Sequence, residues 1–212
     1  MAFIDTIPDS EINDEIRAMY ARQESFWGFV PNYARVFSWR PELMGLWAQL
    51  QIGIKRNMDK RRFELITFAA AHTLRSTLCS LAHGKQLTAF FSKEDIQLMA
   101  KGASPASLTA AEAEMMAFAR KVARGPYTVT AGDVHKLKIN GFSDAEIFDI
   151  AATVSARAFW TGIVESLGVE AEPSLVAMES DFRDALVVGR PIKNGSGCAG
   201  AASAHTPPTA PA

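Results

Sequence analysis

Three segments in the second half of the chain carry the start and stop signals of helices. Each begins with a Ser or Thr followed three residues later by an acid, a capping box in which the two side chains bind backbone N–H groups that the first helical turn leaves unpaired. A glycine, which favours helix ends, then follows at a helical length. The sequence therefore predicts helices over Thr109–Gly125, Thr130–Gly141 and Ser143–Gly168.

The rest of the chain shows the same helical periodicity and no alternating strand pattern, which predicts an all-α fold. Small residues at 69–71 would allow a neighbouring helix to approach closely. Pro41 suits a first helical turn, and Asp59 and Ser76 are natural N-cap residues. The further helices predicted on these grounds cover Ser10–Gln23, Tyr33–Phe37, Pro41–Lys55, residues 60–74, Ser76–Phe91, Ser92–Gly102 and Ser174–Val187.

Length and composition predict one helical core with additions at both ends. The 212 residues, 48% of them hydrophobic, suffice for one good core. We divide the chain into an N-terminal helical arm and connection (1–58), a core (59–189) and a disordered tail (190–212) rich in Gly, Ala, Ser, Thr and Pro. Within the arm, the aromatic residues 26–32, interrupted by Gly28 and Pro31, predict a packed connection that clamps the arm to the core.

Charge and cysteine content exclude several classes of function. The formal net charge of −1 gives no electrostatic basis for binding nucleic acid or an anionic membrane. Two distant cysteines do not form a disulfide scaffold and suit a reducing compartment. The first residues lack the basic and apolar regions of a signal peptide, and no uninterrupted apolar run reaches membrane-spanning length. We therefore expect a cytoplasmic protein.

The residues that could carry chemistry lie between Glu64 and His83. Cys79 and His83 are four residues apart, so a helix places them on one face. With Ser76 as the N-cap, Cys79 falls in the first turn, where the helix dipole favours an anion, so we expect a lowered thiol pKa. Glu64 is an isolated acid in an apolar run and would need a buried partner, for which His83 is the natural candidate. An acid that orients a base beside a thiol is the arrangement of an activated nucleophile.

This pattern resembles the alkylhydroperoxidase D (AhpD)/carboxymuconolactone decarboxylase superfamily. The redox branch of that superfamily has Glu and then Cys-x-x-Cys-x-x-x-His at the spacing of Glu64, Ser76, Cys79 and His83, and the sequence is most similar to peroxidase-related members in which Ser replaces the first cysteine. The similarity extends from about Phe29 to Gly168. It implies an AhpD-like orthogonal helical bundle, an antioxidant peroxidase (peroxiredoxin-type) activity, no metal or organic cofactor, and a homo-oligomer: a trimer, hexamer or dimer.

The resemblance also implies roles for the four residues. Cys79 would reduce a small hydroperoxide substrate, His83 would withdraw the thiol proton, Glu64 would orient His83, and Ser76 would cap the helix and hydrogen-bond to the oxidised sulfur. Because Ser76 cannot form the internal disulfide of the redox branch, regeneration requires an external thiol reductant or a redox partner protein, or Cys198 in the tail.

Two other functions remain open on the sequence. One is a decarboxylase-like lyase or isomerase acting on a small acid or lactone, which would need a proton donor and a cation rather than a thiol. The other is a non-catalytic oligomeric redox sensor. A weak internal repeat, 62–83 against 145–165, also predicts a second helical hairpin, with Thr161 and Glu165 at the positions of Cys79 and His83.

Overall fold

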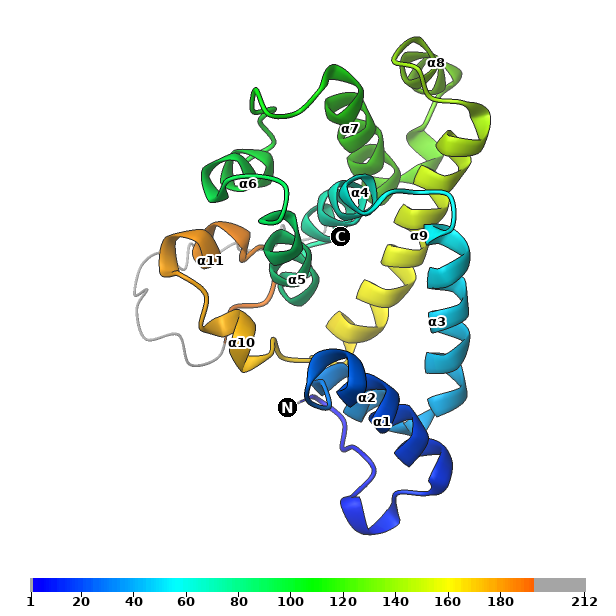
Figure 1. The fold of residues 1–212 in the computed structure, drawn as a ribbon, viewed down its shortest axis with the longest axis vertical. Helices are drawn as coiled ribbons and strands as arrows, with labels where there is room; N and C mark the ends of the chain where they lie inside the picture. The colour runs from blue at the N-terminus through cyan, green and yellow to red at the C-terminus, as the bar shows by residue number, and fades with distance from the viewer. Residues whose placement is uncertain (1, 193–212) are drawn as a thin grey trace, which may run out of the picture.

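The computed structural model describes residues 2–192, and all regular structure in that range is helical, which confirms the predicted all-α fold (Figure 1). The helices of the N-terminal arm are α1 (Asp14–Trp27), α2 (Asn32–Val36) and α3 (Pro41–Lys55). The helices that follow are α4 (Lys60–Thr73), α5 (Thr77–Leu87), α6 (Lys93–Ala100), α7 (Ala110–Arg124), α8 (Ala131–Ile139), α9 (Asp144–Ser166), α10 (Pro173–Val176) and α11 (Ser180–Leu186). Short 3₁₀ turns lie at Asp9–Glu11, Phe37–Trp39 and Pro126–Thr128.

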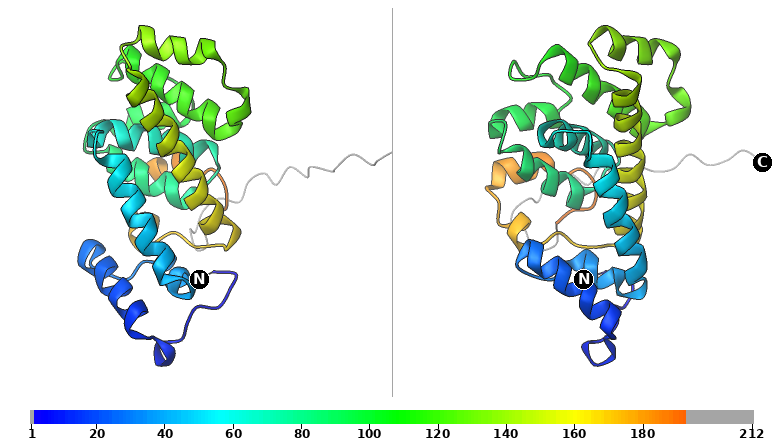
Figure 2. Two further views of the ribbon diagram at one scale, coloured as in Figure 1. Left: turned by 90° about the vertical axis from the view of Figure 1, so that its right-hand side faces the viewer. Right: turned by 45° about the vertical axis from the view of Figure 1, so that its right-hand side comes forward.

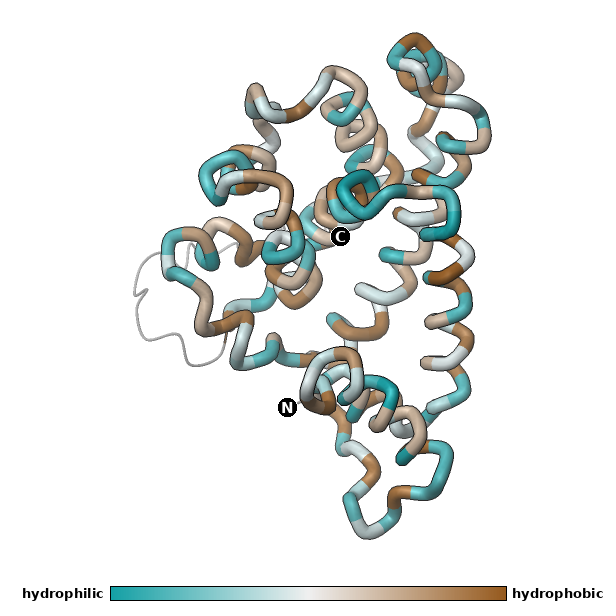
Figure 3. The backbone as a smooth tube through the Cα atoms, in the orientation of Figure 1, coloured by the Kyte–Doolittle hydropathy of each residue, from teal (hydrophilic) through white to brown (hydrophobic). Residues whose placement is uncertain are grey.

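Helix α4 is the central element of the core. Every residue from Phe63 to Ala71 is buried, and α4 packs against α5, α7 and α9. Ala69, Ala70 and Ala71 have no bulk to hold these neighbours away, which agrees with the close approach expected from their size. Hydrophobic and hydrophilic residues are interspersed along each helix of the bundle, as expected for helices with one buried side (Figure 3).

Side-chain caps fix where the central helices begin. The three predicted capping boxes form at the N-termini of α7, α8 and α9. Asp59 and Ser76 cap α4 and α5 by accepting the N–H groups of Arg62 and Cys79. These starts were predictable because a cap depends only on residues within one helical turn.

Three predicted helices have different bounds in the structure. The first begins after the cap Asn13 and ends at the left-handed Gly28, so it lies further along the chain than Ser10–Gln23. The helix predicted over Ser76–Phe91 ends at Leu87. The one predicted over Ser174–Val187 is divided into α10 and α11, because the backbone leaves the helical conformation at Glu179.

Packed aromatic rings attach the N-terminal arm to the core. Tyr33, Phe37 and Trp47 surround the ring of Trp160 on α9, with ring centroids 4.8–5.2 Å from it. Helices α1 and α2 lie at one end of the bundle, and α3 runs alongside α9 (Figure 2). The predicted clamp at 26–32 is wrong for the aromatic residues of that stretch. Phe26 and Trp27 lie in the last turn of α1, and Phe26, Trp27 and Phe29 are 77%, 41% and 36% exposed.

Helix α9 is one continuous helix, so the second hairpin expected from the internal repeat is not present. Its length and mean hydropathy would suffice to cross a membrane, but half of the apolar segment is buried in the bundle. A core helix meets the same criteria, and the packing of α9 against α4 and α7 accounts for its buried apolar residues.

The residues after α11 form a strap, residues 187–192, that crosses the start of α5. The N–H groups of Val188 and Gly189 donate to Thr77 Oγ1, at 3.4 and 3.1 Å. Arg190 donates to the carbonyl oxygen of Glu165, and Ile192 packs on the core. Thus, Arg190 and Ile192, which we had assigned to the tail, belong to the packed structure. The remainder of the predicted tail, with Cys198, lies outside the described residues.

Candidate active site

The turn between α4 and α5 places Cys79 in the first turn of α5, as predicted. Arg75 in this turn adopts a left-handed backbone conformation (φ 58°), and Ser76 then starts the helix. Ser76 Oγ accepts the N–H of Cys79 at 3.4 Å. The two residues are therefore held together at the buried end of α5.

The predicted pair of Glu64 and His83 forms between the neighbouring helices α4 and α5. Glu64 Oε2 lies 2.7 Å from His83 Nδ1, and both side chains are largely buried. With a proton on Nδ1, the ring donates to the carboxylate and leaves Nε2 free to act as a base. No hydrogen bond joins the Cys79 sulfur to the imidazole in the described part of the chain; the two residues are one turn apart on α5.

Burial and nearby charges set the protonation states of this pair. Burial and the charge of Arg157 lower the pKa of His83, so the imidazole is neutral at pH 7. Burial alone would raise the pKa of the Glu64 carboxyl. The hydrogen-bonded His83 and the charges of Lys55 and Arg157 outweigh that effect and lower this pKa overall, so Glu64 is a carboxylate.

The sulfur of Cys79 lies beside the guanidinium of Arg157 on α9. Arg157 Nη1 is 3.7 Å from Cys79 Sγ, and the two residues are 7% and 3% exposed. Burial raises the pKa of the Cys79 thiol, and the charge of Arg157 offsets part of that rise. The lowered pKa expected from the helix start is therefore wrong, because burial in the core outweighs the effect of the first turn.

Ser76 is fully buried and directs its hydroxyl toward α9. Its O–H donates to Glu165 Oε1 at 2.6 Å. Glu165 Oε2 is in turn 3.9 Å from Arg190 Nε in the strap. Since Ser76 has a single hydroxyl proton, its expected hydrogen bond to an oxidised sulfur would require this contact to break.

Sequence reasoning missed Arg157, Glu165 and Lys55 as members of the site. Arg157 is the only basic residue in α9, an isolated charge in an apolar helix, which is the same signal that singled out Glu64. The internal repeat had drawn attention to Glu165, but as a counterpart of His83 rather than a partner of Ser76. Lys55 gave no signal, because a lysine at the end of a helix is usually solvated.

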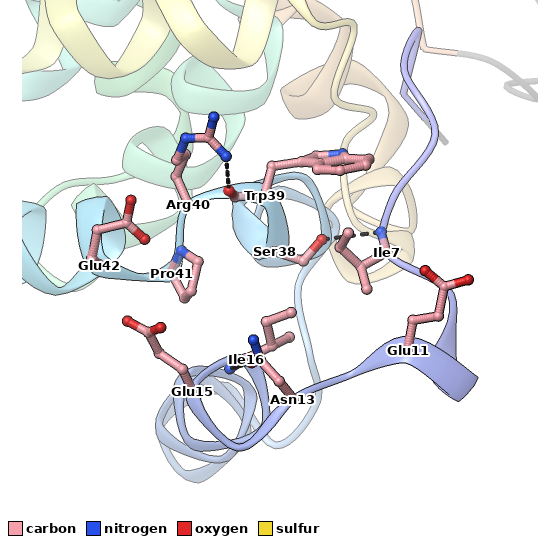
Figure 4. Close-up of a pocket in the computed structure, with 10 residues that line it drawn as sticks. All are labelled: Ile7, Glu11, Asn13, Glu15, Ile16, Ser38, Trp39, Arg40, Pro41 and Glu42. Carbon is pink, nitrogen blue, oxygen red and sulfur yellow. Dashed lines mark hydrogen bonds between the residues drawn. The ribbon is translucent and has the colours of Figure 1, made fainter.

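Two hollows in the described part of the chain could admit a small molecule. The larger, about 390 Å³, is formed by the arm and the start of α3, between Ile16, Ser38 and Arg40 (Figure 4), and none of the four predicted site residues lines it. A smaller one of about 50 Å³ lies beside the first turn of α5, where Thr77, Leu78 and Glu165 face Arg190 of the strap. This second hollow is adjacent to Ser76 and Cys79 along the chain.

The described residues contain no group of three or more His, Cys, Asp or Glu side chains placed to hold a metal ion. The chemistry that the arrangement offers is that of a thiol, an imidazole, a carboxylate and a guanidinium in a buried site.

Comparison with known proteins gives matches in structure and none in sequence. No family model matches the chain, and no curated protein does. An uncharacterized peroxidase-related protein with an AhpD core from Ralstonia eutropha JMP134 aligns with a TM-score of 0.69 at 22% identity, over 82% of this chain and 94% of that one. A peroxidase-related protein from Silicibacter sp. TM1040 aligns with a TM-score of 0.66 at 21% identity, over 81% and 94%. The debrominase Bmp8 aligns with a TM-score of 0.69 at 15% identity, over 85% and 96%.

These matches show that the chain has the AhpD-like all-α fold. At such identities they establish the fold alone, so the activity must be argued from the site.

Proposed function

We propose that this protein is a thiol-dependent oxidoreductase that reduces hydroperoxides through Cys79. The observation that carries the proposal is the 2.7 Å contact of Glu64 with His83, on the two helices that also hold Cys79. A neutral imidazole oriented by a carboxylate is a general base, and the thiol one turn away is the nucleophile that it would serve. The peroxidase-related fold neighbours support this choice of chemistry.

The reaction would proceed in two stages. His83 takes the proton of Cys79, through one bridging water, because the two side chains are one helical turn apart. The thiolate attacks the outer peroxide oxygen, so that an S–O bond forms, the O–O bond breaks, and the leaving alkoxide takes the proton from His83. Sulfur is oxidised by two electrons to a sulfenic acid.

An external thiol would complete the cycle. Its sulfur displaces water from the sulfenic acid to form a mixed disulfide, and a second thiol releases Cys79 as a thiol and leaves with the first as a disulfide. Ser76 cannot act as the resolving group. A small-molecule thiol or a redox partner protein of the cytoplasm would supply the electrons.

The test is peroxide consumption in the presence of excess thiol, with mass spectrometry of Cys79. Cys198→Ser should retain turnover, and Cys79→Ser should abolish it. Oxidation of Cys79 to one equivalent without turnover, whatever the reductant, would instead indicate a redox sensor. Activity on a small acid or lactone that survives in Cys79→Ser would indicate the lyase or isomerase.

A second candidate is reductive removal of bromine from an aromatic ring. The observation that favours it is the match to Bmp8, since an alanine variant of that debrominase was crystallised with 2,3,4-tribromopyrrole and aligns with a TM-score of 0.69. Attack of the thiolate on bromine would form an S–Br bond as the C–Br bond breaks, the ring carbon would take a proton, and the sulfur would be oxidised by two electrons. An external thiol would then displace bromide to form a mixed disulfide, and a second thiol would release Cys79. Bromide release from this compound, compared with peroxide consumption, separates the two activities.

A further inference from the structure

Arg157 is a buried cation whose only hydrogen bond among the described residues is to the sulfur of Cys79. It lies in the middle of α9, is 7% exposed, and makes no ion pair with a carboxylate in the described range. Its Nε atom is buried without a hydrogen-bond partner there. The ring of Trp47, whose centroid is 6.0 Å from the guanidinium carbon, makes a cation–π contact with Arg157 but carries no negative charge.

Burying a charge is costly unless an opposite charge compensates for it. The other ionisable groups of the site already have partners: Glu64 binds His83, and Glu165 accepts from Ser76 and faces Arg190. Lys55 adds a second positive charge over the ring of Phe63. The carboxylate of Glu64 beside the neutral His83 offsets one of these two positive charges. The sulfur, which contacts Arg157, is the group that can supply the second negative charge.

A neutral thiol does not provide that charge, because it is only a weak acceptor. A thiolate does, and so does the sulfenate that forms when the sulfenic acid gives its proton to His83. The new oxygen would also offer an acceptor in the neighbourhood of the unpaired Nε. Ser76 cannot replace Arg157 in this role while its hydroxyl proton is donated to Glu165.

We propose that Arg157 is a catalytic residue that acts as the fixed counter-ion of Cys79, first for the thiolate and then for the sulfenate. The sulfenate part of this assignment rests on the proposed function; the thiolate part does not. On deprotonation the proton leaves to His83 and Arg157 keeps its own. During peroxide reduction the guanidinium stabilises the negative charge on sulfur without exchanging a proton or an electron.

The test is a titration of the thiolate by its ultraviolet absorbance, which does not depend on access to the buried sulfur. The parent is Cys198→Ser, in which Cys79 is the only cysteine, and Cys79→Ser/Cys198→Ser supplies the baseline. Adding Arg157→Met, which is similar in volume, should raise the pKa of Cys79 by at least about one unit, a tenfold loss of thiolate at neutral pH. Arg157→Lys should recover part of the shift. Arg120→Met, the loss of an arginine that contacts Met99 instead, should leave the titration unchanged.

Two results overturn the proposal. One is a Cys79 thiol that titrates at the same pH in the parent and in Arg157→Met. If Arg157→Met does not fold, the same comparison is made with Arg157→Lys and Arg157→Gln. The other is a parent in which Cys79 stays protonated throughout the pH range where the protein is folded. Peroxide turnover is measured separately. A shifted titration without turnover would reject the proposed peroxidase function and support the counter-ion role of Arg157. Turnover with an unshifted titration would support the peroxidase function and reject the counter-ion role.

Discussion

The carboxylate of Glu64 acts on the reaction through the orientation of His83. Glu64→Gln keeps the size of the side chain but loses the charge that holds the proton on Nδ1. We expect the rate of Cys79 oxidation by peroxide to fall about 10²-fold, in the range measured for losses of general-base catalysis. The control is Glu112→Gln, which removes a different carboxylate. Glu112 lies away from the sulfur and pairs with Arg61. That control should lower stability and leave the oxidation rate unchanged; equal losses in both variants would contradict a specific role of Glu64.

The burial of His83 also predicts how stability depends on pH. Burial and the charge of Arg157 hold the pKa of folded His83 below its usual 6.5, so on acidification the unfolded chain binds this proton first. The free energy of unfolding should therefore fall as pH decreases from about 6.5 toward the lower folded pKa. In His83→Gln the fall of stability between pH 7 and pH 5 should be shallower than in the parent. Denaturant melts at a series of pH values measure this slope, and an unchanged slope in His83→Gln would disprove the assignment.

At the scale of whole elements, the start of α9 predicts a local contribution to stability. Ser143 and Glu146 form the capping box, and Glu146 also binds Arg62 on α4 at 2.6 Å. Ser143→Ala should lower the free energy of unfolding by about 1 kcal/mol, whereas Ser155→Ala within the same helix should be close to neutral. The N–H of Ser143 and the charge of Arg62 lower the pKa of Glu146 to about 2 from its ordinary value of 4.5. The stabilisation from the ionised Glu146 carboxylate should therefore be complete above pH 4.5 and disappear as pH falls toward 2. Thermal melts in acid would detect this loss.

The strap crosses the start of α5 at Thr77, two residues before Cys79, and so predicts an effect on access to the sulfur. A Cβ on Gly189 would lie 1.8 Å from the carbonyl oxygen of Arg75, a backbone atom with little freedom to move. Gly189→Ala should therefore displace the strap from Thr77, lower the melting temperature, and speed alkylation of Cys79 several-fold. Gly45→Ala has open space around it in α3 and should stabilise the helix slightly, with no effect on Cys79. Unchanged alkylation in a displaced Gly189→Ala would show that the strap does not restrict access to the sulfur.

Local signals predicted most of the helices, whereas contacts between distant segments determined the rest. The capping boxes and the position of Cys79 in its helix follow from residues within one turn of each other, so the sequence was sufficient. The division of the last helix and the packing of the strap depend on surfaces brought together by folding. For the same reason the pair of Glu64 and His83 was predictable as an acid lacking a partner, but Arg157, 78 residues beyond Cys79, was not assigned to the sulfur.

At the scale of the whole molecule, the fold leaves large apolar side chains exposed on α3 and α9. Leu46 and Leu50, one turn apart on α3, are 66% and 47% exposed, and Phe148 and Phe159, three turns apart on α9, are 71% and 45% exposed. The two helices lie side by side, and the rings of Trp47 and Phe159 are 5.9 Å apart. Exposed apolar surface of this kind is typical of subunit interfaces. We propose that a second copy of the chain covers it in a homo-oligomer.

Charge placed on this surface should disrupt such an assembly without unfolding the subunit. In Leu46→Glu/Leu50→Glu, two carboxylates would have to lose their water in the interface, at a cost of several kcal/mol. We therefore expect sedimentation velocity to show an oligomer for the parent and a monomer for the variant, with unchanged helicity. Tyr127→Glu changes an exposed aromatic residue outside α3 and α9, and should not alter the assembly. A parent that is monomeric at micromolar concentration, or a double variant of unchanged size, would show that these apolar residues do not form a subunit interface.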